Sequence, residues 1–230
     1  MAEFLESISL FPLIVTLGSY QIGLWCQKKT RHALCNPLLI AVILSIGILK
    51  VTSFDLPLYQ SGVSGISWLL TPATVCLAVP LYQQFSLLKK NAKAVLLGIA
   101  AGVLASLTVI LAMSILFHLD HTMYVTLLPK SITTAIGIGV SEELGGIQSL
   151  TVVVIIITGV LGNIFAELIC KVFRITDPIA QGVGIGTSTH AVGTARAMEM
   201  GEIQGAMSGL SIVVAGLMTV VVANLFAGFY

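Results

Sequence analysis

The chain has 230 residues, of which 57% are hydrophobic and only 9% are charged, and its mean hydropathy is +1.03. Soluble domains carry about 25% charged residues, so this composition excludes an ordinary soluble domain and indicates an integral membrane protein. The formal net charge of +1 gives no reason to expect a nucleic-acid partner. The four cysteines lack metal-binding spacing, and we expect no metal and no cofactor.

Six continuous apolar stretches have the length of a transmembrane helix, which takes about 20 residues. They lie near residues 8–26, 36–54, 66–85, 94–117, 148–170 and 205–229. Two further stretches, 121–147 and 178–200, are apolar but interrupted by glycine and polar residues. Because the runs are continuous rather than alternating, we predict an all-α polytopic membrane protein with about six full transmembrane helices.

The first apolar stretch follows the acidic segment MAEFLESISLF, which lacks the basic region of a cleaved signal peptide. We therefore expect this stretch to be retained as a membrane helix. The short connections predict a single transmembrane domain over 1–230. Within it we expect a four-helix part (1–120) and two units (121–176 and 177–230), each made of a helical hairpin followed by a helix.

The two interrupted stretches contain nearly the same sequence. TTAIGIGVSEELGGIQ (133–148) and THAVGTARAMEMGEIQ (189–204) align without gaps and share seven of sixteen residues. The shared residues are Thr, Ala, Gly, Glu, Gly, Ile and Gln. This repeat indicates that the same half-helix arrangement is used twice.

Basic loops favour the cytoplasm and so predict the orientation. The loops after the first and third apolar stretches contain Lys28, Lys29, Arg31, Lys89, Lys90 and Lys93. They place the N-terminus outside. If 121–147 enters and returns to the outside, Lys171 and Arg174 also reach the cytoplasm, and 178–200 enters from the cytoplasmic side.

This arrangement is an inverted-topology repeat of two re-entrant or broken hairpins, an architecture that recurs in transporters. Both copies would then approach one site near the middle of the membrane. The alternative is a parallel repeat in which 121–147 and 178–200 are ordinary broken spans, and the sequence leaves it open.

The first unit, LLPKSITTAIGIGVSEELGG, places a cation among apolar residues. Pro129 interrupts the helix, and a lysine within a membrane is costly unless it is paired or hydrated, so Lys130 indicates a binding site. We predict binding roles for Lys130, Ser131, Thr133 and Thr134, and structural or gating roles for Pro129, Gly137, Gly139 and Glu143. The alternative is that Lys130 lies near the outer interface and extends to water.

The second unit, DPIAQGVGIGTSTHAVGTARAMEMGE, combines alternate glycines with three hydroxyl residues and a histidine. A helix beginning around Thr187 or Ser188 would direct its N-terminal amides at an anion. We predict binding roles for Thr187, Ser188, Thr189 and His190, and structural or gating roles for Gly184, Gly186, Gly193 and Glu199. A histidine in a helix is otherwise simply a satisfied polar group, and that alternative remains for His190.

Two further polar residues have open roles. Arg196 can clamp a carboxylate, or it can pair with Glu199, Glu143 or Glu202. Asn163 shares one helix face with Glu167 and either lines the cavity or joins helices. We count Arg196 and Asn163 among the binding candidates. Gly98 and Gly102 form a GxxxG sequence typical of close helix packing.

Several stretches resemble the LrgB/CidB family of bacterial membrane proteins from Asn36 onward. They are NPLLIAVILSIGIL, TPATVCLAVPLYQQ, LLPKSITTAIGIGVSEELGG, RITDPIAQGVGIGTSTHAVGTARAMEMGE and GAMSGLSIVVAGLMT. The family residues carried over are Pro129, Lys130, Thr133, Thr134, Gly186, Ser188, His190, Gly193, Thr194 and Glu199. Some members have glutamine in place of Lys130 and diverge around Arg196, and this version looks more like the CidB side.

The resemblance implies two functions. The family was named as holin-like or antiholin-like, for control of murein hydrolase export and cell lysis. Relatives, including a plastid member fused to an LrgA-like half, transport small carboxylates, and members usually work beside an LrgA/CidA-type membrane protein.

We therefore expect a transporter of a small monocarboxylate, such as pyruvate, glycolate or glycerate, that works by alternating access. It would lie in the bacterial plasma membrane as a homo-oligomer, with its N-terminus outside and an LrgA/CidA-type partner. The alternative is a holin-like or antiholin-like regulator of murein hydrolase export and lysis. We expect no enzyme, since the sequence contains no activated nucleophile and no carboxylate pair at a catalytic spacing.

Overall fold

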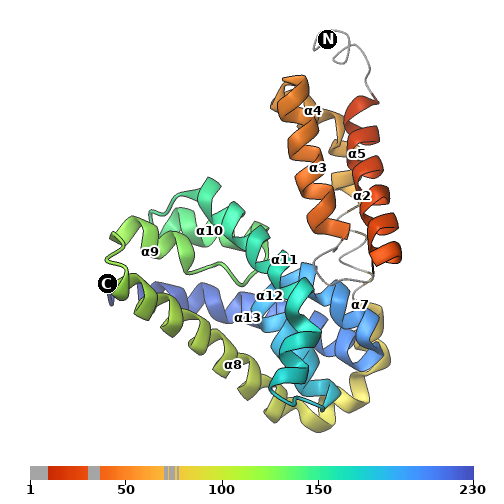
Figure 1. Cartoon of the computed structure of the whole chain (residues 1–230). Helices are drawn as coiled ribbons and strands as arrows, with labels where there is room; N and C mark the ends of the chain where they lie inside the picture. Colours follow the sequence, from red (N-terminus) through yellow and green to blue (C-terminus); the bar gives the residue numbers. More distant parts are fainter. Residues whose placement is uncertain (1–9, 31–36, 70–71, 73–75, 77) are drawn as a thin grey trace. The chain divides into compact units, whose positions relative to one another are not determined.

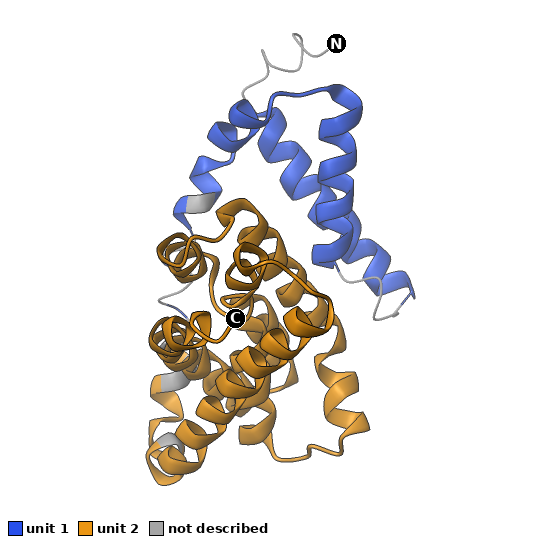
Figure 2. Ribbon diagram, turned by 90° about the vertical axis from the view of Figure 1, so that its left-hand side faces the viewer, with its two compact units in different colours: residues 1–76 blue, residues 77–230 orange. Residues whose placement is uncertain are grey.

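Helices and turns account for the regular structure of this protein, as the computed structural model shows (Figure 1). The structure describes residues 10–30, 37–69, 72, 76 and 78–230, and these contain no strand. The prediction of an all-α protein is confirmed. The chain divides into two compact units, Met1–Cys76 and Leu77–Tyr230 (Figure 2). The predicted three-part division within a single domain stays a prediction.

Unit 1 is built on two helices, α2 (Phe11–Thr30) and α3 (Pro37–Thr52), followed by the short helices α4 (Leu56–Gly62) and α5 (Ser64–Trp68). Gly23 on α2 permits a close approach to α3, since a Cβ there would lie 2.5 Å from the Pro37 carbonyl oxygen. The Tyr59 hydroxyl bonds the Thr16 hydroxyl at 2.6 Å. The first contact packs α2 against α3, and the second holds α4 against α2.

Unit 2 contains three long helices and several short or broken ones. Its helices are α7 (Ala78–Gln83), α8 (Phe85–Leu116), α9 (His121–Leu127), α10 (Thr134–Glu143), α11 (Gln148–Val172), α12 (Pro178–Met200) and α13 (Glu202–Ala227). Its core joins one face of α8 to α9 and α13, with Ile99, Leu107, Tyr124 and Met207 almost fully buried. The shorter or broken helices α9, α10 and α12 each contact at least two of the three long helices.

Three helices in the described part of the chain are long and apolar enough to cross a membrane. They are Lys89–Leu116 within α8, α11 and α13. Large apolar side chains on these helices remain exposed, which suits contact with lipid; Leu97 and Leu217 are examples. The structure thus supports a membrane protein. The count of six full spans is not confirmed: α3 is apolar but shorter, and the predicted span at 66–85 lies partly outside the described residues.

Both repeat units fold through the same order of elements. Each begins with an aspartate cap: Asp120 accepts a hydrogen bond from the Met123 amide at 2.6 Å, and Asp177 accepts one from the Ala180 amide at 2.9 Å. A helix, a break, a second short helix and then a long apolar helix follow in each case.

The break in α12 falls at His190, whose backbone (φ 45°, ψ −145°) is not helical. The prediction that a helix begins around Thr187 or Ser188 is therefore wrong. Those two residues end the first arm of α12, and the second arm begins after His190.

Candidate functional site

The first hairpin, α9 and α10, lies along the N-terminal half of α11. Thr151 of α11 donates to the Thr126 carbonyl on α9 at 3.0 Å and to the Ser141 hydroxyl on α10 at 2.7 Å. One turn further along α11, the Ile155 side chain packs against Gly137 of α10. The turn between α9 and α10 therefore reaches the level of Ile155.

The second hairpin, formed by the two arms of α12, lies along the C-terminal half of α11. On the first arm, Thr189 packs against Gly162. On the second arm, the Val192 carbonyl accepts a hydrogen bond from the Asn163 side chain at 2.7 Å.

The two arms of α12 lie side by side rather than end to end. Ile185 of the first arm and Ala197 of the second pack in one small cluster with Ala166 of α11. A straight helix would place Ile185 and Ala197 about 18 Å apart. The chain therefore reverses direction at His190.

The turns of both hairpins meet beside Ile155, which is fully buried. Its side chain contacts Gly137 of the first hairpin, and its carbonyl oxygen lies 3.0 Å from Nε2 of His190 in the second. The His190 ring also packs on Gly159, near the middle of α11. The repeated sequences thus converge, although they are far apart along the chain.

Contacts along α8 lead to the same conclusion. Gly98 lies against Val183 and Gly102 against Thr187, both on the first arm of α12, so the predicted GxxxG packing role is confirmed. One turn further on, Ser106 shares a 3.1 Å hydrogen bond with Ser131 of the first hairpin. Residues four apart occupy one helix face, so both hairpin turns adjoin neighbouring positions on α8.

Contacts along α13 follow the same order. Its early residue Ser208 packs on Gly186 and bonds Thr194 at 2.7 Å, both in the second hairpin. Its later residue Gly216 adjoins Ile136 of the first hairpin. Each long helix of unit 2 is therefore shared between the hairpins, one at each end.

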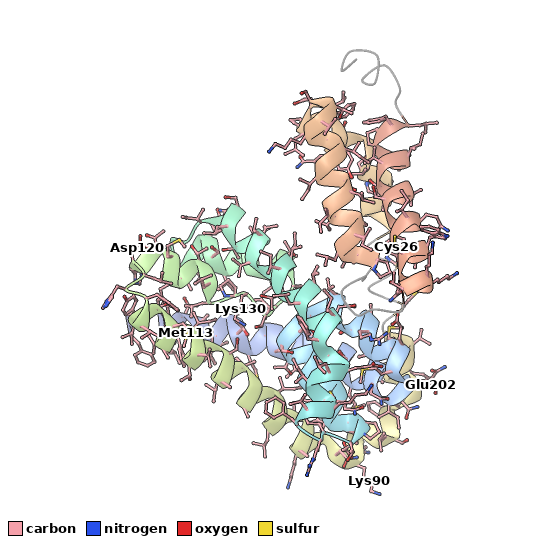
Figure 3. The ribbon with its side chains drawn as sticks, viewed as in Figure 1. Cys26, Lys90, Met113, Asp120, Lys130 and Glu202 are labelled. Carbon is pink, nitrogen blue, oxygen red and sulfur yellow. The ribbon has the colours of Figure 1, made fainter. Side chains whose placement is uncertain are left out.

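The predicted binding residues of the first unit lie at the hairpin turn. Lys130, labelled in Figure 3, is half-buried and donates to the Ser131 hydroxyl at 3.1 Å. Among the described residues, no carboxylate lies within ion-pair distance of it. Thr133 precedes the first residue of α10, Thr134, in an extended conformation and makes no capping hydrogen bond through its side chain. The N-terminal amides of α10 therefore open toward the turn.

The predicted binding residues of the second unit differ in what they contact. Ser188 is exposed and donates to the Gly184 carbonyl, while Thr189 donates to the Ile185 carbonyl. The Thr187 hydroxyl is buried and has no hydrogen-bond partner among the described residues. Thr187 is therefore the hydroxyl residue of this segment whose proton has no acceptor among the described residues.

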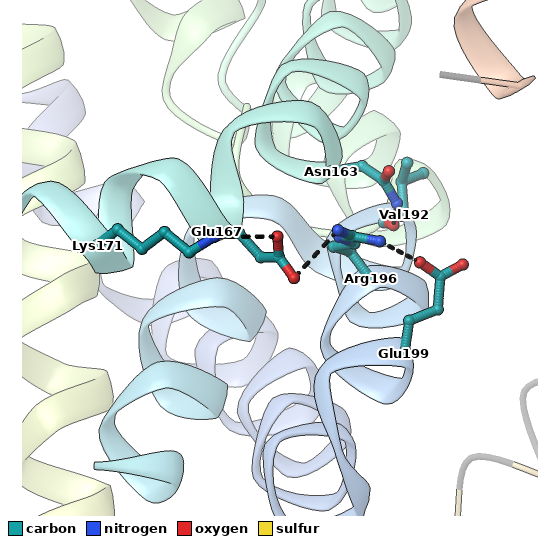
Figure 4. Close-up of polar contacts among 6 residues, drawn as sticks. All are labelled: Asn163, Glu167, Lys171, Val192, Arg196 and Glu199. Carbon is teal, nitrogen blue, oxygen red and sulfur yellow. Dashed lines mark hydrogen bonds and ion pairs between the residues drawn. The ribbon is translucent and has the colours of Figure 1, made fainter. Parts of the chain in front are cut away.

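Arg196 lies further from the turn and joins α12 to α11 (Figure 4). Its guanidinium group pairs with Glu199 at 2.5 Å, as one of the predicted alternatives has it, and with Glu167 at 3.1 Å. Glu167 also lies 3.9 Å from Lys171. Sequence reasoning missed Glu167 as the partner of Arg196. The signal was its position four residues after Asn163, on the helix face that contacts α12.

The predicted structural residues fall into two groups. Those at close contacts are Pro129, Gly137, Gly186 and Gly193, where Pro129 is buried and a Cβ on any of the three glycines would overlap a neighbouring side chain or backbone. Those at exposed positions are Gly139, Gly184, Glu143 and Glu199, of which Glu199 pairs with Arg196. Helix packing accounts for the first group only.

Comparison with known proteins relates the chain to one family. A family model described as the LrgB-like family matches residues 16–229. A relative from Bacillus subtilis (strain 168), named "Antiholin-like protein LrgB", is 37% identical over 217 residues, which cover 94% of each chain. Relatives of the same name from Bacillus mycoides (strain KBAB4) and Bacillus cereus (strain B4264) are 37% identical over 220 residues, 95% of this chain and 96% of theirs. No solved structure matches.

Proposed function

The chain belongs to the LrgB-like family, and from that premise we propose two functions for its membrane domain. The names of the relatives favour an antiholin-like role, that is, the control of murein hydrolase export and cell lysis that the resemblance implies. The arrangement of the two hairpins favours transport of a small monocarboxylate. The names support the first proposal and the geometry supports the second.

Both proposals use the same membrane topology, a multi-pass protein in which the hairpins enter from opposite faces. The support is that each hairpin contacts a different end of α8, α11 and α13, the helices that can cross a membrane. Lys171 and Arg174 after α11 would be cytoplasmic. The N-terminus would lie outside, and the two units would form an inverted-topology repeat.

One observation carries the transport proposal: Lys130, in the turn of the first hairpin, lies beside the middle part of the longest membrane-crossing helix and has no carboxylate partner among the described residues. Its hydrogen-bond chain through Ser131 ends at Ser106, close to the centre of Lys89–Leu116. A cation at that depth costs several kcal/mol unless it is compensated. A bound carboxylate would supply the missing negative charge.

The backbone at the two turns also favours binding of a carboxylate. α10 begins at the turn of the first hairpin, and the second arm of α12 begins at the turn of the other. The N-terminus of a helix carries a partial positive charge and free amide groups. Two such ends near Lys130 and the Thr187 hydroxyl favour an anion over a cation. Access would alternate between the two hairpins, one from each face.

Transport is tested by uptake of labelled pyruvate and glycolate into proteoliposomes, with protein-free liposomes as the control. Because we also propose an LrgA/CidA-type partner and a homo-oligomer, uptake is measured with and without such a partner at several protein densities. Saturable uptake is the expected result. Absence of uptake in every case, together with a lysis defect that the gene restores, would leave the antiholin-like role alone.

A further inference from the structure

Ser106 on α8 is a polar residue outside both repeat units, yet it reaches the turn of the first hairpin. Its Oγ lies 3.1 Å from Ser131 Oγ, and Ser131 Oγ accepts from Lys130 Nζ, also at 3.1 Å. Neither serine has another side-chain hydrogen bond to the described residues. Both hydroxyls therefore have bonding capacity left.

The number of protons that Lys130, Ser131 and Ser106 can donate indicates what kind of group these three side chains can bind. The Lys130 ammonium only donates, so it occupies a lone pair of Ser131. The hydrogen bond between the two hydroxyls uses one of their two protons. The other proton is left for an acceptor, and the remaining ammonium protons are left as well. The cluster of Lys130, Ser131 and Ser106 is thus rich in donors and suits an anion.

A second donor lies one helical turn away. Thr187 packs against Gly102, the residue four before Ser106 on α8, and a Cβ at Gly102 would lie 2.7 Å from the Thr187 methyl carbon. Thr187 is 5% exposed, and its hydroxyl has no described partner. Ser106 and the contact position of Thr187 are thus one turn apart on α8, and one turn of α-helix rises about 5.4 Å. A carboxylate can span such a separation, because each of its two oxygens accepts a separate hydrogen bond.

We propose that Ser106 is a ligand-binding residue, and that it and Thr187 hold the carboxylate of a small monocarboxylate between α8 and the two hairpins. This proposal rests on the proposed transport function and adds α8 as a third side of the site. The first hairpin contributes Lys130 and Ser131, and the second contributes Thr187.

The test measures binding of pyruvate and glycolate to the purified full-length protein in detergent, by calorimetry and by ligand-induced thermal stabilisation. Ser106→Ala and Thr187→Val each remove one hydroxyl and are expected to weaken binding about tenfold, the order of one hydrogen bond to a charged group. Ser114→Ala is the matched control. It makes the same change on the same helix at a buried hydroxyl without a described partner, two turns away, and it is expected to bind like the wild type.

Each outcome has a separate meaning. If the wild type binds but Ser106→Ala and Thr187→Val also bind normally, the new assignment is wrong while the transport proposal stands. If the wild type binds neither acid, the transport proposal is wrong, and the assignment of Ser106 and Thr187 is wrong with it. If Ser106→Ala does not fold, Thr187→Val decides, since valine keeps the shape that packs on Gly102.

Discussion

The two hairpins of unit 2 share a sequence but reverse direction in different ways. The first turns through residues 128–133, and its Lys130 donates to the Ser131 hydroxyl and has no carboxylate partner among the described residues. The second turns at one residue, His190, in a backbone conformation that is uncommon for residues other than glycine. His190 is fixed there by its contact with the Ile155 carbonyl, and Arg196 fixes the returning arm.

The comparison separates residues that shape the backbone from residues available for a ligand. The identical positions include Gly137 and Gly193, which lie at close contacts in their respective hairpins. The differing positions include His190, which aligns with Thr134, and the turn residue Lys130 lies before the aligned stretch. We infer that the repeated residues preserve a common backbone arrangement in both hairpins. Within it, the first hairpin supplies the charged group for the ligand, and the second is an anchored support.

The largest effect is expected in a test of topology, which is all-or-none. In a cysteine-free background, a cysteine at Arg174 should react with a membrane-impermeant reagent only from the cytoplasmic side. A cysteine at Gly145, between the first hairpin and α11, should react only from the outside. Positions within the first basic loop serve as the cytoplasmic reference. Labelling of position 174 from outside would contradict opposite entry and favour two full spans.

Uptake should depend more on the charge of the first hairpin, which carries Lys130, than on a charge at the exposed surface. Lys130→Ala is expected to reduce carboxylate uptake at least about tenfold, equivalent to about 1.4 kcal/mol, because no other described cation adjoins Ser131. Lys171→Ala removes the same charge from an exposed side chain and is the matched control. Uptake in proteoliposomes is compared at equal amounts of folded protein. Equal uptake by both variants would remove Lys130 from the site.

The sequence predicted the parts of this site that depend on local signals. Pro129 and the repeated glycines predicted two interrupted helices, and Lys130 predicted the charged turn. The sequence did not predict the break at His190, because the Thr-Ser-Thr-His segment fits a helix start equally well and the contact with Ile155 lies 35 residues away. Only the tertiary contact selects the residue at which the chain turns.

Ser106 was missed for a related reason, since its partner Ser131 is 25 residues away. A weak signal was present. Gly98, Gly102 and Ser106 continue one small residue per turn, and the third position of that series is the polar one. The pairing of Arg196 with Glu167 likewise depends on how α12 folds back on α11, which composition and spacing do not reveal.

The stability of the protein should depend on close packing of the second hairpin, the anchored support. At Gly186 a Cβ would meet the backbone of Ser208 on α13, whereas Gly184, two residues earlier on the same arm, faces open space. Gly186→Ala is expected to destabilise the protein by about 1–3 kcal/mol, because backbone atoms cannot move aside as a side chain can. Gly184→Ala is expected to be neutral, or stabilising by up to about 1 kcal/mol. Thermal unfolding in detergent measures both, and equal unfolding temperatures would contradict the close packing of α12 on α13.

The smallest effect is expected at the ion pair between α11 and the returning arm of α12. Arg196 and Glu167 are partly exposed, and such pairs contribute about 0.2–1 kcal/mol. Glu167→Gln keeps the shape of the side chain and leaves Glu199 to pair with Arg196. If the second hairpin is the anchored support, the variant should unfold at nearly the wild-type temperature and keep its uptake rate, as should the control Glu199→Gln. A severalfold change in uptake for Glu167→Gln alone would mean that this ion pair opens during transport. The second hairpin would then be the moving part, and the comparison between the two hairpins would be reversed.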